Sequence, residues 1–222
     1  MPGRRALAIL SLLGASALCV ATVEIRTYET GDTYYRFLIW NLILAWIPLA
    51  FATAAYRRAR RRVDLGVAVL LVPWLLFFPN APYLLTDFVH LGKGPAPLWY
   101  DALMLSAFAW TGLLLGFASL YLVQLVARRA YGGTAAWLGV VCVLGLASVG
   151  VYVGRFIRFN SWDALLHPVR VASVLQDELD AVPGRLAGGL LALTAFLLVG
   201  YLAVYSFTDL ELELEDEARA PR

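Results

Sequence analysis

Charged residues are scarce in this chain of 222 residues: Asp, Glu, Lys and Arg make up 15% of it, and lysine occurs once, as Lys93. Soluble domains carry about 25% charged and about 45–50% apolar residues, whereas 61% of this chain is hydrophobic. This composition excludes an ordinary soluble domain and predicts an integral membrane protein. The net charge of only +2 predicts no broad basic surface, so nucleic acid is not an expected partner.

Cysteine and histidine are also rare, with two residues of each. Cys19 and Cys142 lie inside apolar runs, which argues against a disulfide framework and indicates small core residues. The chain contains no G-x-S-x-G, H-E-x-x-H, P-loop or G-x-G-x-x-G motif. The nucleophile, zinc and nucleotide sites built by these motifs are therefore not predicted, and no cofactor is expected.

Six apolar segments suit helices that cross a hydrocarbon core ~30 Å thick. Arg4 and Arg5 precede the first of them, so a cleaved signal peptide is the alternative there, although the poor cleavage site favours a retained span. We predict an all-α integral membrane bundle of six transmembrane helices. They are Ala6–Val23, Phe37–Tyr56, Val63–Phe78, Ala102–Ala127, Thr134–Val153 and Leu186–Phe207.

The distribution of basic residues predicts that both termini face the cytoplasm. With this orientation the inner segments hold 11 of the 18 basic residues, and the run RRARRR at residues 57–62 contributes most. Residues 1–208 would form a single transmembrane domain, and residues 209–222, with six acidic residues, a cytoplasmic tail. The Arg-rich, Ala-rich and Leu-rich composition is typical of a GC-rich bacterium, so we expect a multi-pass protein of the bacterial inner membrane.

The third segment is short and leads into FPNAPYLLTDFVHL, residues Phe78 to Leu91. Sixteen helical residues reach only ~24 Å, so Pro79 would interrupt the span at membrane depth. Irregular backbone there must be buried in protein or line a wet cavity. A short second helix from Tyr83 would carry Tyr83, Asp87 and His90 on one face. The structural alternative is a kinked helix end whose polar groups simply meet water.

A second polar stretch, GRFIRFNSWDALLHP, follows the fifth segment at residues 154–168. Arg155 and Arg158 are three residues apart and share a helix face. They suit either a phosphate or carboxylate ligand or structural ion pairs with Asp87 and Asp163. Asn160 and Asp163 fit a helix cap. Residues 168–182 then predict an amphipathic helix at the outer face, stopped by Pro183-Gly184.

A more specific interpretation of the two histidines is that they bind a metal ion. Asp87, His90, Asp163 and His167 would suit a divalent ion. The patterns D-x-x-H and D-x-x-x-H are common, however, and we assign no metal.

Three stretches together resemble one known family. WNLILAWIPL, WLLFFPNAPYLLTDFVHL and GRFIRFNSWD, in this order and spacing, are similar to the bacterial membrane family catalogued as domain of unknown function number 1361. The resemblance covers roughly Phe37 to Phe207. It implies a multi-span inner-membrane protein with no established activity, and it supplies no catalytic residue. His167 is not part of the family's pattern, which weakens the metal hypothesis.

The sequence thus predicts one polar site at the outer end of the bundle, for an anionic or lipid-linked ligand. Arg155 and Arg158 would hold the anion, and Asp87 and His90 would handle a proton or a metal ion. A membrane enzyme acting on a lipid-linked substrate and a non-catalytic assembly partner in the bilayer are the alternatives, and the oligomeric state is left open. The predicted site residues are Asn80, Tyr83, Asp87, His90, Arg155, Arg158, Asn160 and Asp163.

Overall fold

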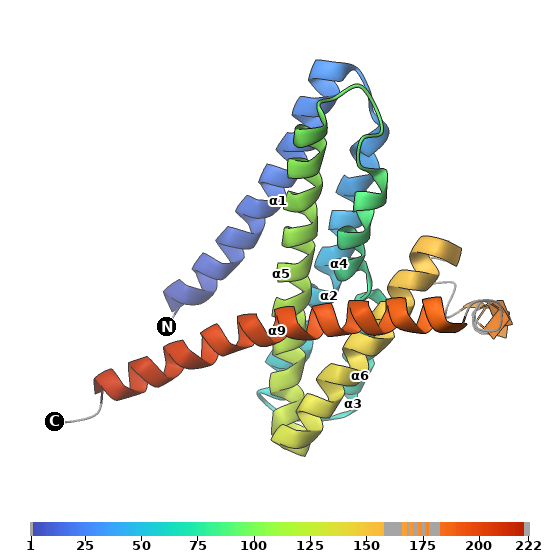
Figure 1. Cartoon of the computed structure of the whole chain (residues 1–222). Coiled ribbons are helices and arrows are strands. Elements are labelled where there is room, and N and C mark those ends of the chain that lie inside the picture. Colours follow the sequence, from blue (N-terminus) through green and yellow to red (C-terminus); the bar gives the residue numbers. More distant parts are fainter. Residues whose placement is uncertain are drawn as a thin grey trace.

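The computed structural model describes residues 2–157, 166–167, 169–170, 173–174, 176–177 and 183–219. Helices account for nearly all of them, and this described part of the chain contains no β-strand, so the predicted all-α class is confirmed (Figure 1). In chain order the elements are α1 (Pro2–Thr30), η1 (Tyr34–Arg36), α2 (Phe37–Ala59), α3 (Leu65–Phe77), α4 (Asn80–Tyr83), η2 (Leu84–His90), α5 (Leu98–Tyr131), α6 (Gly133–Tyr152), η3 (Val153–Ile157) and α9 (Pro183–Arg219).

Six helical segments are long and apolar enough to cross a membrane, and each overlaps one of the six predicted spans. Leu65–His90 counts as one of them, although it is made of α3, α4 and η2. The first span reaches Thr30 and places Cys19 and Val23 in the core, so this segment is part of the folded bundle. The orientation of the termini stays a prediction. Besides Leu65–His90, the spans are Ala6–Thr30, Tyr34–Ala59, Leu98–Tyr131, Gly133–Ile157 and Leu186–Phe207.

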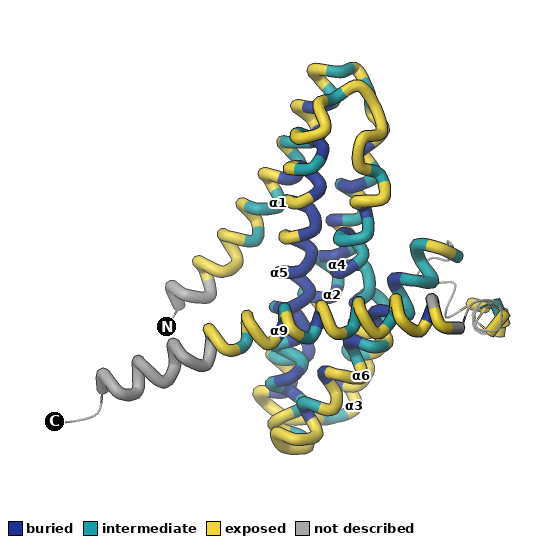
Figure 2. Tube along the Cα trace, in the orientation of Figure 1, coloured by how far each residue is buried: buried dark blue, intermediate teal, exposed yellow. Residues whose placement is uncertain are grey.

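Helix α5 is the central element of the bundle. It contacts α1, α2, α4, η2, α6 and α9, and Figure 2 shows buried residues along most of its length. Its 34 residues extend for ~51 Å, well beyond the ~30 Å of a hydrocarbon core. By contrast, α1 and the apolar part of α9 are largely exposed, and α9 lies across α5 and α6 (Figures 1 and 2). In a membrane their exposed apolar side chains face lipid.

The third span is broken where the sequence predicts it. Helix α3 ends at Phe77, and Pro79 forms the N-cap of the single turn α4. The segment that follows differs from the expected α-helix because η2 is a 3₁₀-helix. With three residues per turn, Leu84, Asp87 and His90 fall on one side, and the first two are buried.

A glycine on α5 allows the broken span to approach closely. A Cβ atom on Gly112 would lie 2.5 Å from the carbonyl oxygen of Ala81 and 2.7 Å from a methyl group of Leu84. Such distances are too short for any side chain, and backbone cannot move aside cheaply. Gly112 therefore fixes the separation between α5 and the polar turn that carries the candidate site.

Two predictions about the C-terminal part of the chain stay predictions. The predicted amphipathic helix at 168–182 lies mostly outside the described residues. Helix α9 continues to Arg219 and so includes most of the acidic segment. The division at residue 208 remains a prediction.

Candidate functional site

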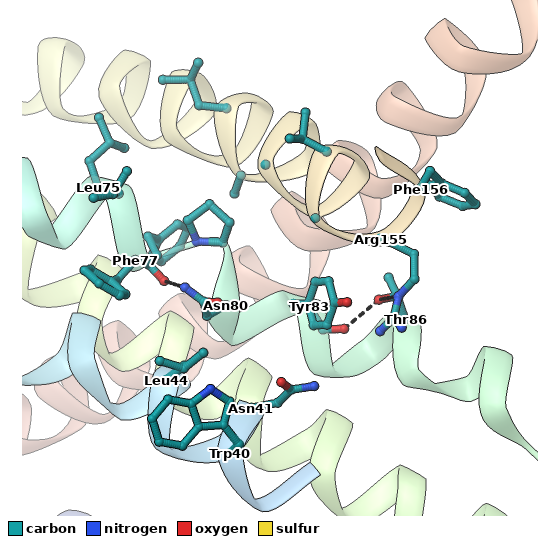
Figure 3. A pocket seen from close by; sticks show the side chains of 18 of the residues that line it. Trp40, Asn41, Leu44, Leu75, Phe77, Asn80, Tyr83, Thr86, Arg155 and Phe156 are labelled. Carbon is teal, nitrogen blue, oxygen red and sulfur yellow. Dashed lines mark hydrogen bonds between the residues drawn. The ribbon is translucent and has the colours of Figure 1, made fainter. Parts of the chain in front are cut away.

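Arg155 reaches the broken third span from the end of α6. Residues Val153–Ile157 form a π-helical turn, η3, and such turns are frequent at functional sites. The wider turn directs the guanidinium of Arg155 over the ring of Tyr83, with 4.2 Å between the guanidinium carbon and the ring centroid. Figure 3 shows Arg155 beside Tyr83 and Thr86. Two of the predicted stretches, PNAPYLLTDFVH and GRFIRFNSWD, therefore meet at Arg155.

Three hydrogen bonds hold the Arg155 guanidinium. Its Nε donates to Oγ1 of Thr86 at 2.9 Å, Nη1 donates to Nε2 of His90 at 3.2 Å, and Nη2 forms an ion pair with Oδ1 of Asp87. The side chain of Arg155 is 12% exposed. These bonds to described residues use three of its five N–H groups.

Asp87 is fully buried, and both of its carboxylate oxygens have partners. Oδ1 pairs with Arg155, while Oδ2 accepts from Nδ2 of Asn41 at 3.3 Å. A buried carboxylate is tolerated when it is paired and hydrogen-bonded in this way. The structure thus joins Asp87 to Arg155 as the structural ion pair that the sequence left open, and it adds Asn41 of α2 to the site.

His90 is held from both sides of its ring. Nε2 faces Nη1 of Arg155, and Nδ1 lies 2.9 Å from the hydroxyl oxygen of Tyr34. Because a guanidinium can only donate, Nε2 must be the acceptor. The ring is therefore the neutral tautomer with its proton on Nδ1, donated to Tyr34. The ring of Phe37 packs edge-on against His90, with centroids 5.0 Å apart.

A groove of about 1020 Å³ runs along the helix break, between α2, the third span and the end of α6. Figure 3 shows its side chains, with Leu44, Leu75 and Phe77 toward one end and Thr86 and Arg155 toward the other. Trp40, Val72, Val89 and Phe156 line the groove and are also exposed at the protein surface, so the groove is open at its side. Its polar lining residues are Asn41, Asn80, Tyr83, Thr86, His90, Lys93 and Arg155.

A second buried ion pair lies next to this site. Nε of Arg26 donates to Oδ1 of Asp101 at 2.7 Å, and both side chains are at most 1% exposed. Nη1 of Arg26 donates to Asp32 at 3.0 Å, and Nη2 donates to the carbonyl oxygen of Lys93 at 3.2 Å. The backbone N–H of Tyr34 and the Arg26 guanidinium hold the pKa of Asp32 below its usual value.

Tyr35 connects the two ion pairs. Its ring lies 4.4 Å from the guanidinium carbon of Arg26, and its hydroxyl group donates to the carbonyl oxygen of His90. Sequence reasoning missed Arg26, Asp101 and the tyrosine pair at 34–35. The signal that could have found the ion pair was weak. Arg26 follows the first apolar segment and Asp101 precedes the fourth, and a charged residue so close to a membrane span usually needs a partner.

The predicted site residues divide into two groups. Asn80, Tyr83, Asp87, His90 and Arg155 lie together, and all but the buried Asp87 line the groove. Nδ2 of Asn80 donates to the carbonyl oxygen of Phe77 at 2.9 Å. Arg158, Asn160 and Asp163 lie outside the described residues. Within the described part of the chain, no group of three or more His, Cys, Asp or Glu side chains could hold a metal ion.

The fold defines an all-helical, multi-pass membrane protein whose third span is broken beside a polar cluster. A family model described as "Protein of unknown function (DUF1361)" matches residues 40–210. Since this match covers most of the chain, the protein belongs to that family, and the resemblance drawn from the three stretches is confirmed. No curated protein and no solved structure matches the chain.

Proposed function

We propose that this protein binds an amphiphilic, anionic or lipid-linked ligand in the groove, at the outer face of the bacterial plasma membrane. The observation that carries the proposal is the division of the groove into an apolar arm and a polar end at the helix break. Ligand pockets are typically apolar clefts of about 300–1,000 Å³ with a few placed polar groups. This groove agrees with that description in size and in lining.

The side opening supports a ligand that arrives from the bilayer. The exposed rim residues belong to α2, α3, η2 and η3, whose neighbouring surfaces are apolar. A hydrocarbon chain could enter between α2 and α6 without leaving the membrane. Such a chain would lie along Leu44, Leu75 and Leu146, which line the apolar arm.

The polar end supports an anionic head group. Lys93 lines the groove and has no carboxylate within 4 Å among the described residues, whereas the charge of Arg155 is balanced by Asp87. Two N–H groups of the Arg155 guanidinium make no bond to a described residue, and they can donate to a phosphate or carboxylate oxygen. Lys93 therefore supplies the unbalanced charge, and Arg155 supplies directed hydrogen bonds.

The contacts favour binding over catalysis. Both ring nitrogens of His90 are engaged, with Arg155 and Tyr34, and both oxygens of Asp87 are engaged as well. Neither group is free to act as a general base in this arrangement. A path through the membrane is also unsupported, because Gln124 is the main polar residue of the inner halves and it is buried against Tyr201.

The test is photo-crosslinking of the purified full chain with a phospholipid that carries a diazirine in its acyl chain and a phosphate head group. We expect labelled peptides from α3 and α6, and we expect Leu146→Trp to reduce labelling severalfold by filling the apolar arm. Leu138→Trp is the matched control, since Leu138 is exposed on the same helix and does not line the groove. Labelling spread evenly over all helices, unchanged by Leu146→Trp, would refute the proposal.

The polar end is tested with the same probe. Lys93→Gln should weaken labelling in the groove, and a probe with a zwitterionic head group should label it less than one with an anionic head group. Arg36→Gln serves as the control, because Arg36 is an exposed arginine that pairs with Glu24 at the same end of the bundle. Equal labelling by both probes would assign the groove to the hydrocarbon chain alone.

A further inference from the structure

Seven arginines gather at the far end of the bundle from the Arg26–Asp101 pair. Five of them, within residues 57–62, end α2 and form the turn to α3, and Arg128 and Arg129 lie in the last turn of α5. All seven are exposed. Nη1 of Arg129 donates to the carbonyl oxygen of Arg60 at 3.3 Å, so two segments that are 69 residues apart meet in one surface, the arginine cluster.

Among the described residues, one carboxylate, that of Asp64, neutralises part of the charge of this cluster. Asp64 accepts two hydrogen bonds from Arg58, at 2.8 and 2.9 Å, and pairs with Arg62 at 2.5 Å. The Arg58 guanidinium lowers the pKa of Asp64 to about 2, so the carboxylate is charged at neutral pH. The remaining five arginines have no carboxylate within 4 Å among the described side chains. The cluster therefore carries a formal charge of +6, since seven guanidinium groups face one carboxylate.

In a membrane, the arginine cluster would lie at the level of the lipid head groups. It lies at the ends of the membrane-spanning helices α2 and α5 and just before the start of α3. Val63 and Leu65, beside it in the turn, are 45% and 80% exposed, which suits contact with acyl chains. Arginine side chains at such a place extend from the apolar surface to the level of the phosphates.

We infer that the arginine cluster is a binding site for the head groups of anionic phospholipids, separate from the groove. Clusters of four to eight basic residues next to membrane spans are typical of such sites. Arginine presents a planar fork that matches phosphate oxygens, which lysine does not. Orientation of the chain requires only positive charge, whereas contacts in this cluster also position individual guanidinium groups. Asp64 holds those of Arg58 and Arg62, and the carbonyl oxygen of Arg60 holds that of Arg129.

The experiment measures lipid selectivity of the full chain in phosphatidylcholine vesicles. Spin-labelled phosphatidylglycerol and spin-labelled phosphatidylcholine are compared for their protein-bound fraction by electron paramagnetic resonance. We expect severalfold preference for phosphatidylglycerol, decreasing with salt because exposed charges are screened. These measurements use a Lys93→Gln background, which removes the unbalanced charge of the groove. In this background the preference should be lost in Arg57→Gln/Arg60→Gln/Arg61→Gln, and Arg128→Gln/Arg129→Gln should reduce it.

Two controls make the result specific. Arg36→Gln removes an exposed arginine at the other end of the bundle and should leave the preference intact. Probe lipid in both leaflets makes the measurement independent of the direction of insertion, and an unchanged unfolding temperature shows that the variants fold. In the Lys93→Gln background, equal binding of the two lipids before the cluster is changed, or a preference that survives both cluster variants, would overturn the inference and indicate that another partner or solvent occupies the cluster.

Discussion

Arg155 and Asp87 form an ion pair across 68 residues of sequence, between the π-helical end of α6 and the 3₁₀-helical turn of the third span. Asp87 is fully buried, and its other oxygen is bonded to Asn41 of α2. The carboxylate of Asp87 thus connects the second, third and fifth spans at the polar end of the groove. Because this pair is shielded from water, its partners depend on each other strongly.

Removing one member of this pair should destabilise the protein more than removing both. Asp87→Leu leaves the Arg155 guanidinium largely buried without a counter-charge, which typically costs about 3–5 kcal/mol. Asp87→Leu combined with Arg155→Met replaces both charges by apolar groups and should recover much of that loss. Thermal unfolding of Asp87→Leu, Arg155→Met and the double variant in detergent measures the difference. If the double variant were as unstable as the sum of the single variants, the two side chains would not be coupled.

The close approach of α5 to the broken span predicts a sharp effect at Gly112. Gly112→Ala places a methyl group 2.5 Å from a backbone oxygen of Ala81, and overpacking of this kind costs about 1–3 kcal/mol. Gly145→Ala is the matched control, since a Cβ atom there meets nothing within 4 Å. The unfolding temperature should drop for Gly112→Ala only. Equal behaviour of the two variants would contradict the close contact.

The sequence predicted the spans and the break but only part of the site. Apolar length and the two prolines of PNAP are local signals, so they predicted six helices and the interruption at Pro79. The partner of Arg155 depends on how α6 packs against the third span. The sequence spacing of the two stretches could not decide whether Arg155 pairs with Asp87 or with a ligand. Arg26 and Asp101 are 75 residues apart, and no local pattern relates them. The sequence pattern also predicted an α-helix where the structure has the 3₁₀-helix η2. Packing, and not the sequence pattern, decides where such short 3₁₀ segments form.

The turn from α2 to α3 should respond to acid in a defined range of pH. Asp64 is the N-cap of α3, and its pKa is about 2 because Arg58 donates to it. A lowered pKa in the folded state stabilises the protein fully above the ordinary carboxyl pKa of about 4. The contribution is lost as the pH falls toward 2. We therefore expect the stability difference between the unaltered protein and Asp64→Asn to be constant from pH 5 to 8 and to shrink below about pH 4. A difference that stayed constant down to pH 2 would argue against the pairing with Arg58.

The hydrogen bonds around His90 predict its tautomer. Arg155 can only donate to Nε2, so the proton must be on Nδ1, facing Tyr34. Nitrogen-15 solid-state NMR of the reconstituted protein can read this directly. Since the chain has two histidines, His167→Asn leaves a single imidazole signal. We expect a protonated Nδ1 and an unprotonated Nε2, and we expect Tyr34→Phe to leave that assignment unchanged because the Arg155 donor remains. Arg155→Leu removes the donor and should allow the proton to reach Nε2. A proton on Nε2 in the unaltered protein would show that Arg155 does not face His90, and the arrangement of the polar end of the groove would then have to be different.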